Sequence, residues 1–315
     1  MKTALIFGCN GQDGSLLSRS LLKKGYKVIG LSRSNIKPST NHLKLGIHDN
    51  IVRVEGNICE FETIASLIET HHPEEIYNLA GQSSVGESFR KPIETINSIV
   101  NGTINILEVI KKTSYSGKVF FAGSGEIFGN TQTPADLNHK QRPLSPYAIA
   151  KQTSFNLVKT YREINKLNCC TGVLFNHESH LRGEFFVTKK IINTAKAISK
   201  NKNSKLKLGN IDVIRDWGWA PEYVEAMQMM LNTEASNDQI ICTGSPISLK
   251  IFISKVFSYY NLDWQEYIQI DKKFFRPNEI KQSFGNPEQI YNDLGWKAKV
   301  NFDSMIDKII NSSLD

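Results

Sequence analysis

A glycine-rich segment near the start of the chain constrains the fold more than any other feature. The apolar run at residues 3–7 leads directly into segment 8–14, which reads GCNGQDG, and an amphipathic helical pattern follows. Gly8 allows a tight turn after a buried strand, Gly11 lets the backbone approach a pyrophosphate, and Gly14 lets the helix pack on the strand. Free N–H groups at the start of that helix attract phosphate. The pattern predicts a βαβ unit that binds a dinucleotide.

Short apolar runs alternate with amphipathic helical patterns through the first half of the chain. Strands are expected at 3–7, 27–31, 51–55, 75–79, 118–122 and 170–175, and helices at 15–24, 61–70, 92–112 and 146–165. Strands that alternate with helices of this length form right-handed βαβ units around a parallel sheet. The fold class is therefore predicted to be α/β, a doubly wound parallel sheet of the Rossmann type.

The second half of the chain lacks this regular alternation. Helices are expected at 188–200, 220–232, 249–260, 287–294 and 302–311, with one further strand at 239–242. We predict a smaller, mixed α/β lobe that binds the substrate, formed by residues 176–210 and 246–315. Residues 1–175 are expected to form the dinucleotide-binding domain, to which residues 211–245 return.

Composition is that of an ordinary globular protein and indicates a reducing compartment. Of the 315 residues, 40% are hydrophobic and 22% are charged. Five cysteines, an odd number without a CxxC pair, argue against a disulfide framework and against a zinc site, so we expect no metal. No stretch reaches the roughly 18 apolar residues of a membrane span, and the N-terminal apolar run is too short for a signal peptide. We expect a cytoplasmic protein without a membrane partner.

The formal net charge of +7 favours an anionic partner. The lysines are dispersed, with a modest cluster at residues 196–207 and no basic tail. A solvated lysine-rich surface is therefore favoured over a nucleic-acid site, and some of the charge is expected to serve phosphorylated small molecules. A non-enzymatic alternative stays open at this point: a cofactor-sensing or nucleic-acid-binding protein of the same fold.

The end of the second strand indicates which dinucleotide is bound. Enzymes that bind NAD usually carry an acidic residue there, which holds the ribose 2′-hydroxyl. No acidic residue occurs between positions 30 and 45, where Arg33 stands at the strand end and Lys37 is nearby. A guanidinium suits the 2′-phosphate of NADP. We predict NADP as the cofactor, with NAD as the alternative.

Tyr147 and Lys151, four residues apart, open a predicted helix. They lie on one helix face, and the ammonium is expected to lower the pKa of the phenol toward the working pH. Tyr147 could then act as the base for a sugar hydroxyl. Ser124 and Glu126 follow the strand at 118–122, at the sheet edge where ligands bind. Ser124 could hydrogen-bond the same hydroxyl.

Together these features resemble the extended short-chain dehydrogenase/reductase family over nearly the whole chain. The resemblance implies that Ser124, Tyr147 and Lys151 form the catalytic set of that family. A narrower resemblance is to the GDP-mannose 4,6-dehydratases, and it rests on several motifs in the same order along the chain. These are GQDGS at 11–15, IYNLAGQS at 76–83, LFNHES at 174–179, RDWG at 215–218 and RPNE at 276–279.

Glu126 distinguishes a dehydratase from other members of the wider family. An epimerase or reductase needs only the tyrosine, whereas a dehydratase must also remove the C5 proton and help hydroxide leave C6, which a carboxylate can do. The family motif TSE corresponds here to SGE at 124–126. The resemblance implies a lyase that converts GDP-mannose to GDP-4-keto-6-deoxymannose by transient oxidation at C4, elimination of water across C5 and C6, and return of the hydride to C6.

Departures from the family pattern leave alternatives open. The family has PRRG where this chain has HLRG at 180–183, close to the sugar, which leaves open a modified sugar and a GDP-heptose 4,6-dehydratase as an alternative. A related nucleotide-sugar 4-dehydrogenase or epimerase is a further alternative. The family loop that builds a tetramer around NADP usually carries two arginines; only Arg33 remains here, and His42 aligns roughly with another arginine. We expect a homodimer or a homotetramer.

The resemblance also assigns binding residues. The cofactor set is Gly8, Gly11, Gln12, Asp13, Gly14, Arg33, Asn57 (in place of an aspartate expected near the adenine), Ile58, Leu79, Ala80, Tyr147, Lys151 and His177. The set for the GDP-sugar is Ser83, Asn176, Lys190, Leu208, Gly209, Arg215, Arg276 and Glu279. Arg215 and Arg276 are implied to clamp the diphosphate, and Glu279 to accept hydrogen bonds from the nucleoside end.

Overall fold

Seven parallel strands form the central sheet of the computed structural model, which describes residues 1–33, 38–201, 203–234 and 236–312. Their order across the sheet is β10 (Gln239–Ile241), β6 (Cys169–Leu174), β5 (Lys118–Ala122), β4 (Glu75–Asn78), β1 (Thr3–Phe7), β2 (Lys27–Ser32) and β3 (Val52–Glu55). The chain order reverses between β1 and β4, the position where doubly wound sheets bind ligands. The predicted Rossmann-type fold is confirmed.

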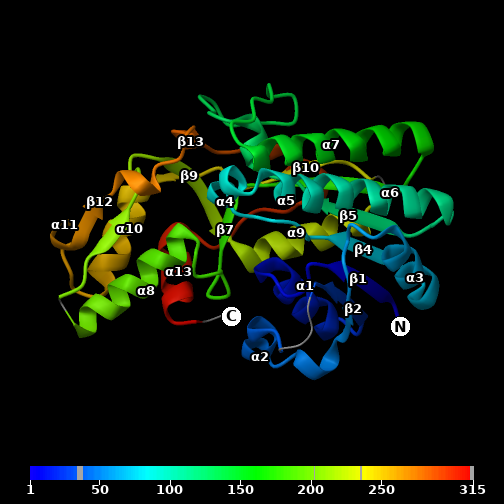
Figure 1. Ribbon diagram of the computed structural model, residues 1–315, viewed down its shortest axis with the longest axis horizontal. Helices are drawn as coiled ribbons and strands as arrows, with labels where there is room; N and C mark the ends of the chain where they lie inside the picture. Colours follow the sequence, from blue (N-terminus) through cyan, green and yellow to red (C-terminus); the bar gives the residue numbers. More distant parts are fainter. Residues whose placement is uncertain (34–37, 202, 235, 313–315) are drawn as a thin grey trace.

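Helices cover both faces of this sheet (Figure 1). On one face, α1 (Gln12–Lys23) and α9 (Ala220–Asn232) pack against each other. On the other face lie α3 (Phe61–His71), α6 (Gly102–Lys112) and α7 (Pro146–Asn165). Because both faces are covered, the strands are continuous apolar runs rather than alternating ones, as parallel sheets usually are.

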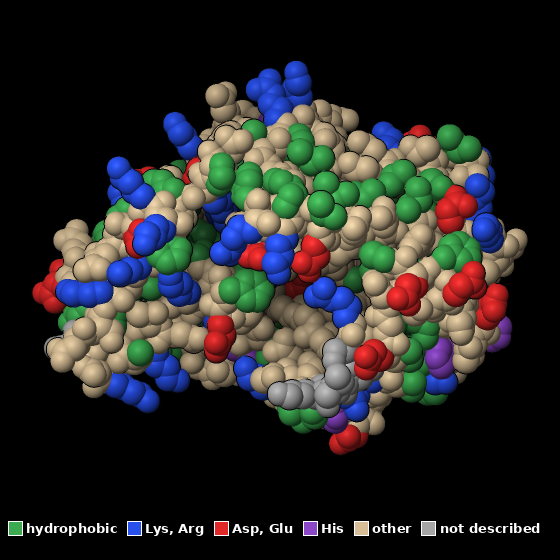
Figure 2. Space-filling view, in the orientation of Figure 1, with side chains coloured by type: hydrophobic (Ala, Val, Ile, Leu, Met, Phe, Trp, Pro, Cys, Tyr) green, Lys and Arg blue, Asp and Glu red, His purple; other side chains and the backbone are tan. Residues whose placement is uncertain are grey.

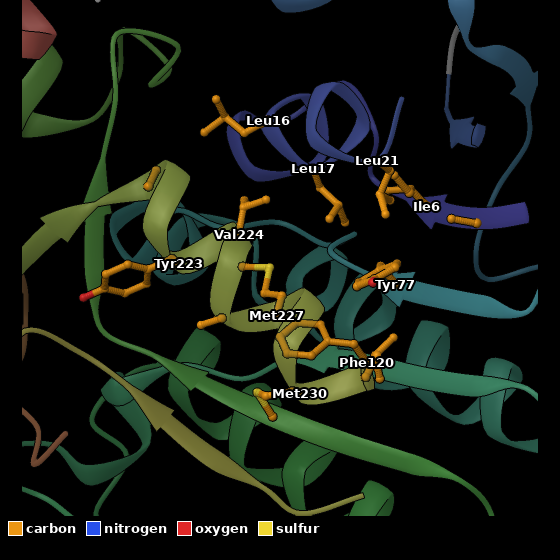
Figure 3. Packing of buried hydrophobic residues seen from close by; sticks show 14 of the residues in the cluster. Ile6, Leu16, Leu17, Leu21, Tyr77, Phe120, Tyr223, Val224, Met227 and Met230 are labelled. Atoms are coloured by element: carbon orange, nitrogen blue, oxygen red, sulfur yellow. The ribbon is translucent and has the colours of Figure 1, made fainter. Parts of the chain in front are cut away.

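Figure 3 shows how α1 and α9 share one core. Leu17 and Leu21 of α1 point toward Met227 of α9, and Tyr77 and Phe120 of the sheet lie beneath them. All five side chains are almost completely buried. Each contributes about 1.5–3 kcal/mol by leaving water, so this core fixes the position of α1 relative to the sheet.

The predicted helix at 92–112 is divided into three segments. It consists of α5 (Pro92–Ile96), a π-helical turn η2 (Asn97–Asn101) and then α6. The Ile99 carbonyl oxygen accepts hydrogen bonds from the hydroxyls of Thr103, at 2.7 Å, and Ser154, at 3.3 Å. These hydroxyls compete with helical N–H groups for the Ile99 carbonyl oxygen. The spacing of apolar residues, from which the helix was predicted, contains no information about such side-chain hydrogen bonds.

A second lobe lies beside the sheet and occupies the left side of Figure 1. It contains helices α8 (Val187–Lys200), α10 (Leu249–Tyr259), α11 (Trp264–Tyr267) and α13 (Phe302–Ile310). Its small sheet joins β7 (Asn176–Glu178), β9 (Ile214–Trp219), β11 (Pro246–Ser248) and β13 (Gln282–Ser283), and β8 (Leu206–Leu208) pairs with β12 (Ile268–Ile270). Shorter helices elsewhere are α2 (Thr40–Leu45), α4 (Val85–Arg90) and α12 (Glu288–Leu294).

The predicted return of residues 211–245 to the first domain describes part of this segment. α9 covers the central sheet and β10 extends it, whereas β9 pairs with β7, β11 and β13 in the second lobe. The division of the chain into two domains stays a proposal, and the pairing of β9 favours assigning residues 214–219 to the second lobe. Among the helices of the described residues, none is long and apolar enough to cross a membrane.

Candidate active site

The glycine turn presses the start of α1 against the end of β1. Gly8 has φ +85°, and a Cβ atom on it would lie 2.8 Å from the Leu79 carbonyl group. A Cβ on Gly14 would lie 2.3 Å from the Gly8 oxygen, whereas one on Gly11 would meet that oxygen at 3.4 Å. No side chain caps the N-terminus of α1. Its first N–H groups are therefore available to an anion, as a pyrophosphate requires.

A cavity of about 1430 Å³ opens beside this turn, and Figure 2 shows the hollow between the two lobes. Its walls include ten predicted cofactor residues and one predicted substrate residue: Gly8, Gly11, Gln12, Asp13, Gly14, Arg33, Asn57, Ile58, Leu79 and Ala80, together with Ser83. The turn and this cavity suit a dinucleotide in both size and chemistry. Lys37, which the sequence placed near the second strand, lies outside the described residues.

Positive charge gathers around the cavity. Six cationic side chains are among the lining residues: Arg33, Lys44, Arg90, Lys91, Arg182 and Lys189. Three acidic side chains accompany them: Asp13, Glu94 and Glu184. This excess of cations suits phosphorylated ligands.

Tyr147 is held in the first turn of α7 by the local sequence. Ser145 caps the helix by accepting a hydrogen bond from the Ala148 N–H at 3.1 Å, and Pro146 occupies the first helical position. One turn later, Lys151 donates to the Ala122 carbonyl oxygen at 2.7 Å, and its Nζ lies 5.9 Å from the centre of the Tyr147 ring. The predicted pair therefore lies at the end of β5, and the YxxxK spacing places both side chains on one face of α7.

Ser124 lies within reach of the Tyr147 hydroxyl. Burial raises the pKa of Tyr147 to about 12, and a side-chain hydrogen bond with Ser124 partly opposes this rise. Burial also lowers the pKa of Lys151 to about 8, against the charge of Asp13. The expectation that Lys151 lowers the pKa of Tyr147 below its ordinary value is thus wrong for the ligand-free protein. Burial outweighs Ser124 and Arg182, the groups that lower the pKa of Tyr147, because desolvation disfavours the charged form of the phenol.

Glu126 belongs to a cluster of four charged side chains. Glu279 Oε1 lies 3.4 Å from Arg215 Nη2 and 3.7 Å from Arg276 Nη1. Burial lowers the pKa of Arg215, and the charge of Glu126 is the strongest opposing influence. The structure therefore brings together the predicted proton-transfer carboxylate and the predicted diphosphate clamp, and it places Glu279 between the two arginines.

The other predicted substrate residues form a separate group. Lys190 Nζ donates to the Lys207 carbonyl oxygen at 2.7 Å and lies 4.3 Å from the centre of the Phe274 ring. Leu208 ends β8, and a Cβ on Gly209 would lie 2.4 Å from the Phe274 oxygen. Asn176 begins β7. Among the described residues, no hydrogen bond or ion pair joins Lys190, Leu208 or Gly209 to the arginine cluster.

Arg182 is a site residue that the sequence analysis did not assign. Its Nε lies 3.2 Å from Glu178 Oε2, and its guanidinium carbon lies 3.6 Å from the centre of the Phe186 ring. It lines the cavity, and its charge lowers the pKa of Tyr147. The signal in the sequence was an arginine four residues after a glutamate in a matched motif.

His180, the changed residue of the HLRG segment, does not line the cavity. Burial lowers its pKa to about 4, and the charged groups that act on it are Lys189, Lys44 and Arg19. Leu181, Arg182 and Gly183 do line the cavity. The described residues contain no group of three or more potential metal ligands.

Solved structures with the same architecture include enzymes of nucleotide-sugar metabolism. The dTDP-glucose 4,6-dehydratase of Bacillus anthracis, solved in complex with NAD, matches with a TM-score of 0.86 and 18% identity, over 99% of this chain and 96% of that chain. The UDP-glucose 4-epimerase of Thermus thermophilus, also in complex with NAD, matches with a TM-score of 0.87 and 20% identity, over 98% of each chain. The fold is that of the extended short-chain dehydrogenase/reductase class.

Sequence comparisons narrow this class. A family model described as GDP-mannose 4,6 dehydratase matches residues 5–309. GDP-mannose 4,6 dehydratase 1 of Arabidopsis thaliana is 37% identical over 100% of this chain and 90% of its own length. The GDP-mannose 4,6-dehydratase of Sinorhizobium fredii is 34% identical over 99% of this chain and 97% of its own length. The chain belongs to the GDP-mannose 4,6-dehydratase family, so the predicted membership of a dehydratase family is confirmed.

The lowered pKa of Lys151 gives a prediction for stability. Burial holds this pKa at about 8 in the folded protein, against an ordinary value of 10.5. Below pH 8 the ammonium is charged in both states, so the cost of its burial is fully present; above pH 10.5 it is neutral in both, and the cost is gone. Lys151→Met should therefore raise the free energy of unfolding at pH 7 by about 1–3 kcal/mol, while abolishing activity.

Chemical denaturation at several pH values measures this difference. The gap between wild type and Lys151→Met should close as the pH rises from 8 to 10.5. Lys159→Met is the matched control, because Lys159 is an exposed lysine of the same helix. A gap that does not change with pH, or an equal gap in the control, would contradict the assigned burial cost.

Proposed function

We propose that this protein converts GDP-mannose to GDP-4-keto-6-deoxymannose. The observation that carries the proposal is the position of Glu126, whose charge acts on both Arg215 and Tyr147 and which therefore lies in the same site as the Ser124–Tyr147–Lys151 set. An enzyme that only oxidises or epimerises C4 has no need of this carboxylate. Family membership and the curated relatives named for this reaction support the same conclusion.

We propose that the cavity beside the glycine turn holds a nicotinamide dinucleotide. Support comes from the uncapped start of α1, from the close approach of backbone at Gly8 and Gly14, and from the cationic lining. When bound, the nicotinamide supplies a reversible hydride acceptor next to the sugar. The protein supplies orientation and proton management.

Tyr147 is the base for the sugar 4-hydroxyl in this proposal. Ser124, whose side chain is close enough to Tyr147 to lower its pKa, can hold the substrate oxygen beside it. Lys151 lies against the Tyr147 ring and stays anchored to the Ala122 carbonyl, so its charge remains close to the phenol. This charge stabilises the phenolate form of Tyr147, which takes the proton of the substrate hydroxyl and becomes a neutral phenol.

Glu126 carries the elimination step. Once C4 is a carbonyl, the C5–H bond is acidic, and a carboxylate can take that proton. The same group, now a carboxylic acid, can give the proton to the hydroxyl that leaves C6 as water. Arg215 and Arg276 would hold the diphosphate and so fix the sugar in front of Glu126. The diphosphate would compete with Glu279 for the two arginines.

Glu126→Gln tests this assignment. We expect kcat for the 4-keto-6-deoxy product to fall about 10²–10⁴-fold, the usual effect of losing a general acid–base group. The amide keeps the size of the side chain but cannot accept the C5 proton. Mass spectrometry of the product from GDP-mannose measures the loss of water, and exchange of the C5 proton with deuterium from solvent measures the proton step separately.

Glu62→Gln, on the exposed face of α3, is the control and should keep wild-type activity. A parallel incubation with a GDP-heptose distinguishes the alternative substrate. Net accumulation of reduced cofactor without loss of water would identify a 4-dehydrogenase, and a C4 epimer would identify an epimerase. Failure of the wild-type enzyme to dehydrate either GDP-sugar would overturn the proposal.

We further propose that NADP is preferred over NAD. Arg33 stands at the cavity wall after β2, and its Nη1 lies 3.5 Å from Glu94 Oε1 on α5. Both side chains are largely exposed, so this ion pair is weak and a 2′-phosphate could displace Glu94. Glu94 thus becomes a candidate for tuning cofactor choice, because it competes with the phosphate for the same guanidinium.

Two substitutions test this preference. Arg33→Ala should weaken NADP binding about 10-fold or more and leave NAD affinity nearly unchanged, because NAD lacks the 2′-phosphate. Glu94→Gln should strengthen NADP binding by about 2–5-fold, since it frees Arg33 from a surface ion pair. Fluorescence titration of both cofactors measures the ratio. Equal weakening of NAD and NADP in Arg33→Ala would contradict a contact to the 2′-phosphate.

We propose that the protein forms a homodimer through α5 and α7. These helices pack together and expose Ile93, Ile96 and Ile149, and Figure 2 shows hydrophobic side chains gathered over this region. Ile149→Lys should convert the dimer to a monomer, because it would bury a charge in the interface. Light scattering measures the mass. A wild-type tetramer would select the alternative left open by the sequence, and a wild-type monomer would refute the proposal.

We infer that the partners are small phosphorylated molecules rather than nucleic acid, because cationic side chains surround the ligand cavity. We also infer a reducing compartment such as the cytoplasm. All five cysteines are free, and four of them are buried. Buried thiols are typical of proteins that work where disulfides do not form.

A further inference from the structure

A buried histidine connects the glycine turn to the second lobe. His177 lies in β7 and is 7% exposed. Its Nε2 is 2.9 Å from Asp13 Oδ2, and its Nδ1 is 2.7 Å from the Phe175 carbonyl oxygen. Asp13 belongs to the first turn of α1, directly beside the N–H groups available for a pyrophosphate.

The hydrogen-bond geometry indicates the protonation state of the ring. A backbone carbonyl oxygen and an ionised carboxylate can only accept hydrogen bonds, and a neutral imidazole has one N–H to give. If Asp13 is ionised, only a doubly protonated ring can donate to both oxygens. The competing arrangement places a proton on Asp13 and leaves Nε2 as an acceptor, so that both groups are neutral.

The surroundings of Asp13 favour the charged arrangement. Gln12 donates to its second oxygen, Oδ1, at 3.1 Å, and the cations Arg182 and Lys151 act on the same carboxylate. Burial raises the pKa of Asp13, but the charge and hydrogen bond of His177 outweigh it, and the pKa is lowered.

The surroundings of the His177 ring also favour the charged arrangement. Burial lowers its pKa, and the charge and hydrogen bond of Asp13 together raise it above the ordinary value, against Arg182. From α9, Tyr223 stacks on the imidazole with ring centres 4.6 Å apart, and an aromatic face attracts a cation. From α7, Tyr147 and Lys151 are near enough for the charge of Asp13 to raise the pKa of both.

The pair is also tied to the second lobe through Gln12. Its side chain donates to the His177 carbonyl oxygen at 3.1 Å and accepts from the Ser179 hydroxyl at 2.9 Å. The first turn of α1 is therefore hydrogen-bonded to two residues of the segment that runs from Asn176 toward Arg182, namely His177 and Ser179. A shift of this turn would move both the cofactor cradle and the groups that face the sugar.

We propose that His177 is an imidazolium at neutral pH that positions the glycine turn and cancels the charge of Asp13 beneath the bound pyrophosphate. This proposal rests on the proposed cofactor site. An unpaired carboxylate in the first turn of α1 would compete with the pyrophosphate for the same N–H groups and would repel it. Paired with the imidazolium, the carboxylate is electrically neutral toward the ligand and holds β7 in place.

The protonation state is measured directly on the wild-type protein. In protein labelled with ¹⁵N-histidine, both ring nitrogens of His177 should give imidazolium signals at pH 7, assigned by their loss in His177→Gln. The signals should persist above the ordinary range of a histidine, and Asp13→Asn should move the transition to lower pH. A singly protonated or unprotonated ring in wild type at pH 7 would overturn the proposal, whatever the enzyme does.

Cofactor affinity measures the positioning role. His177→Gln should weaken NADP binding about 10–100-fold, because it leaves a carboxylate unpaired beside the phosphates. Asp13→Asn should weaken it less, since the amide oxygen still accepts from the ring. The double variant Asp13→Asn/His177→Gln should recover affinity to within a few-fold of wild type. If the pair served packing alone, the double variant would bind no better than the weaker single variant, and that result would refute the proposal.

The pH dependence and a control complete the test. Wild-type NADP affinity should fall as the pH rises through the His177 transition seen by NMR, and the double variant should lack this fall. His180→Gln, a second buried histidine three residues away, should change affinity less than about threefold. If wild type itself bound no dinucleotide, the proposed cofactor site would fail, whereas the NMR result would still decide the charge of His177.

Discussion

The close approach of α1 to the end of β1 is the constraint on which the rest of the site depends. It is possible because Gly14 has no Cβ to strike the Gly8 oxygen, and because Gly8 can adopt a positive φ. The core that α1 shares with α9 then holds the helix in place. Three things follow from this single contact: free N–H groups face the cavity, Asp13 reaches His177, and Gln12 reaches the segment after β7.

Burial is the second physical influence on the site, and it acts on acids and bases in opposite directions. It raises the pKa of Tyr147 to about 12 and lowers that of Lys151 to about 8. The ligand-free enzyme therefore disfavours the phenolate that the reaction needs, whereas Lys151 still carries most of its charge at pH 7. Ligand binding must change this balance, because a dinucleotide and a GDP-sugar alter both the charge and the water content of the cleft. The catalytic groups are thus held in a state that the substrate completes.

The first half of the fold was predicted well because its strands and helices are determined by patterns within short stretches of sequence. β1, β5, α7 and α9 begin and end at the predicted residues, since strands buried on both faces read as apolar runs and helices read as periodic ones. The short strands of the second lobe were not predicted. A strand of two or three residues is too short to show a hydrophobic period. In the longer strand β9, the buried polar residues Arg215 and Asp216 interrupt the apolar pattern. Arg215 belongs to the site through Glu279, whereas the Asp216 carboxylate accepts hydrogen bonds from Thr243 and Gly244.

The same distinction applies to the site residues. Motif resemblance brought together Ser124, Tyr147, Lys151 and the turn, whose geometry depends on spacing within one or two elements. It did not find Arg182 or Glu94, because each acquires its role only through a tertiary contact, with Phe186 and with Arg33. The direction of the Tyr147 pKa was also wrong, since spacing shows which groups are neighbours but not how much water they lose.

A common principle relates the acidic residues of a site that must bind anions. Carboxylates near a pyrophosphate repel it unless a cation cancels their charge. Asp13 is paired with His177, Glu178 with Arg182, and Glu279 with Arg215 and Arg276. Glu126, by contrast, makes no ion pair with any described residue and is influenced by Arg215 through charge at longer range. A carboxylate that must take a proton from carbon and deliver it to oxygen cannot be locked into a salt bridge, and Glu126 meets this requirement.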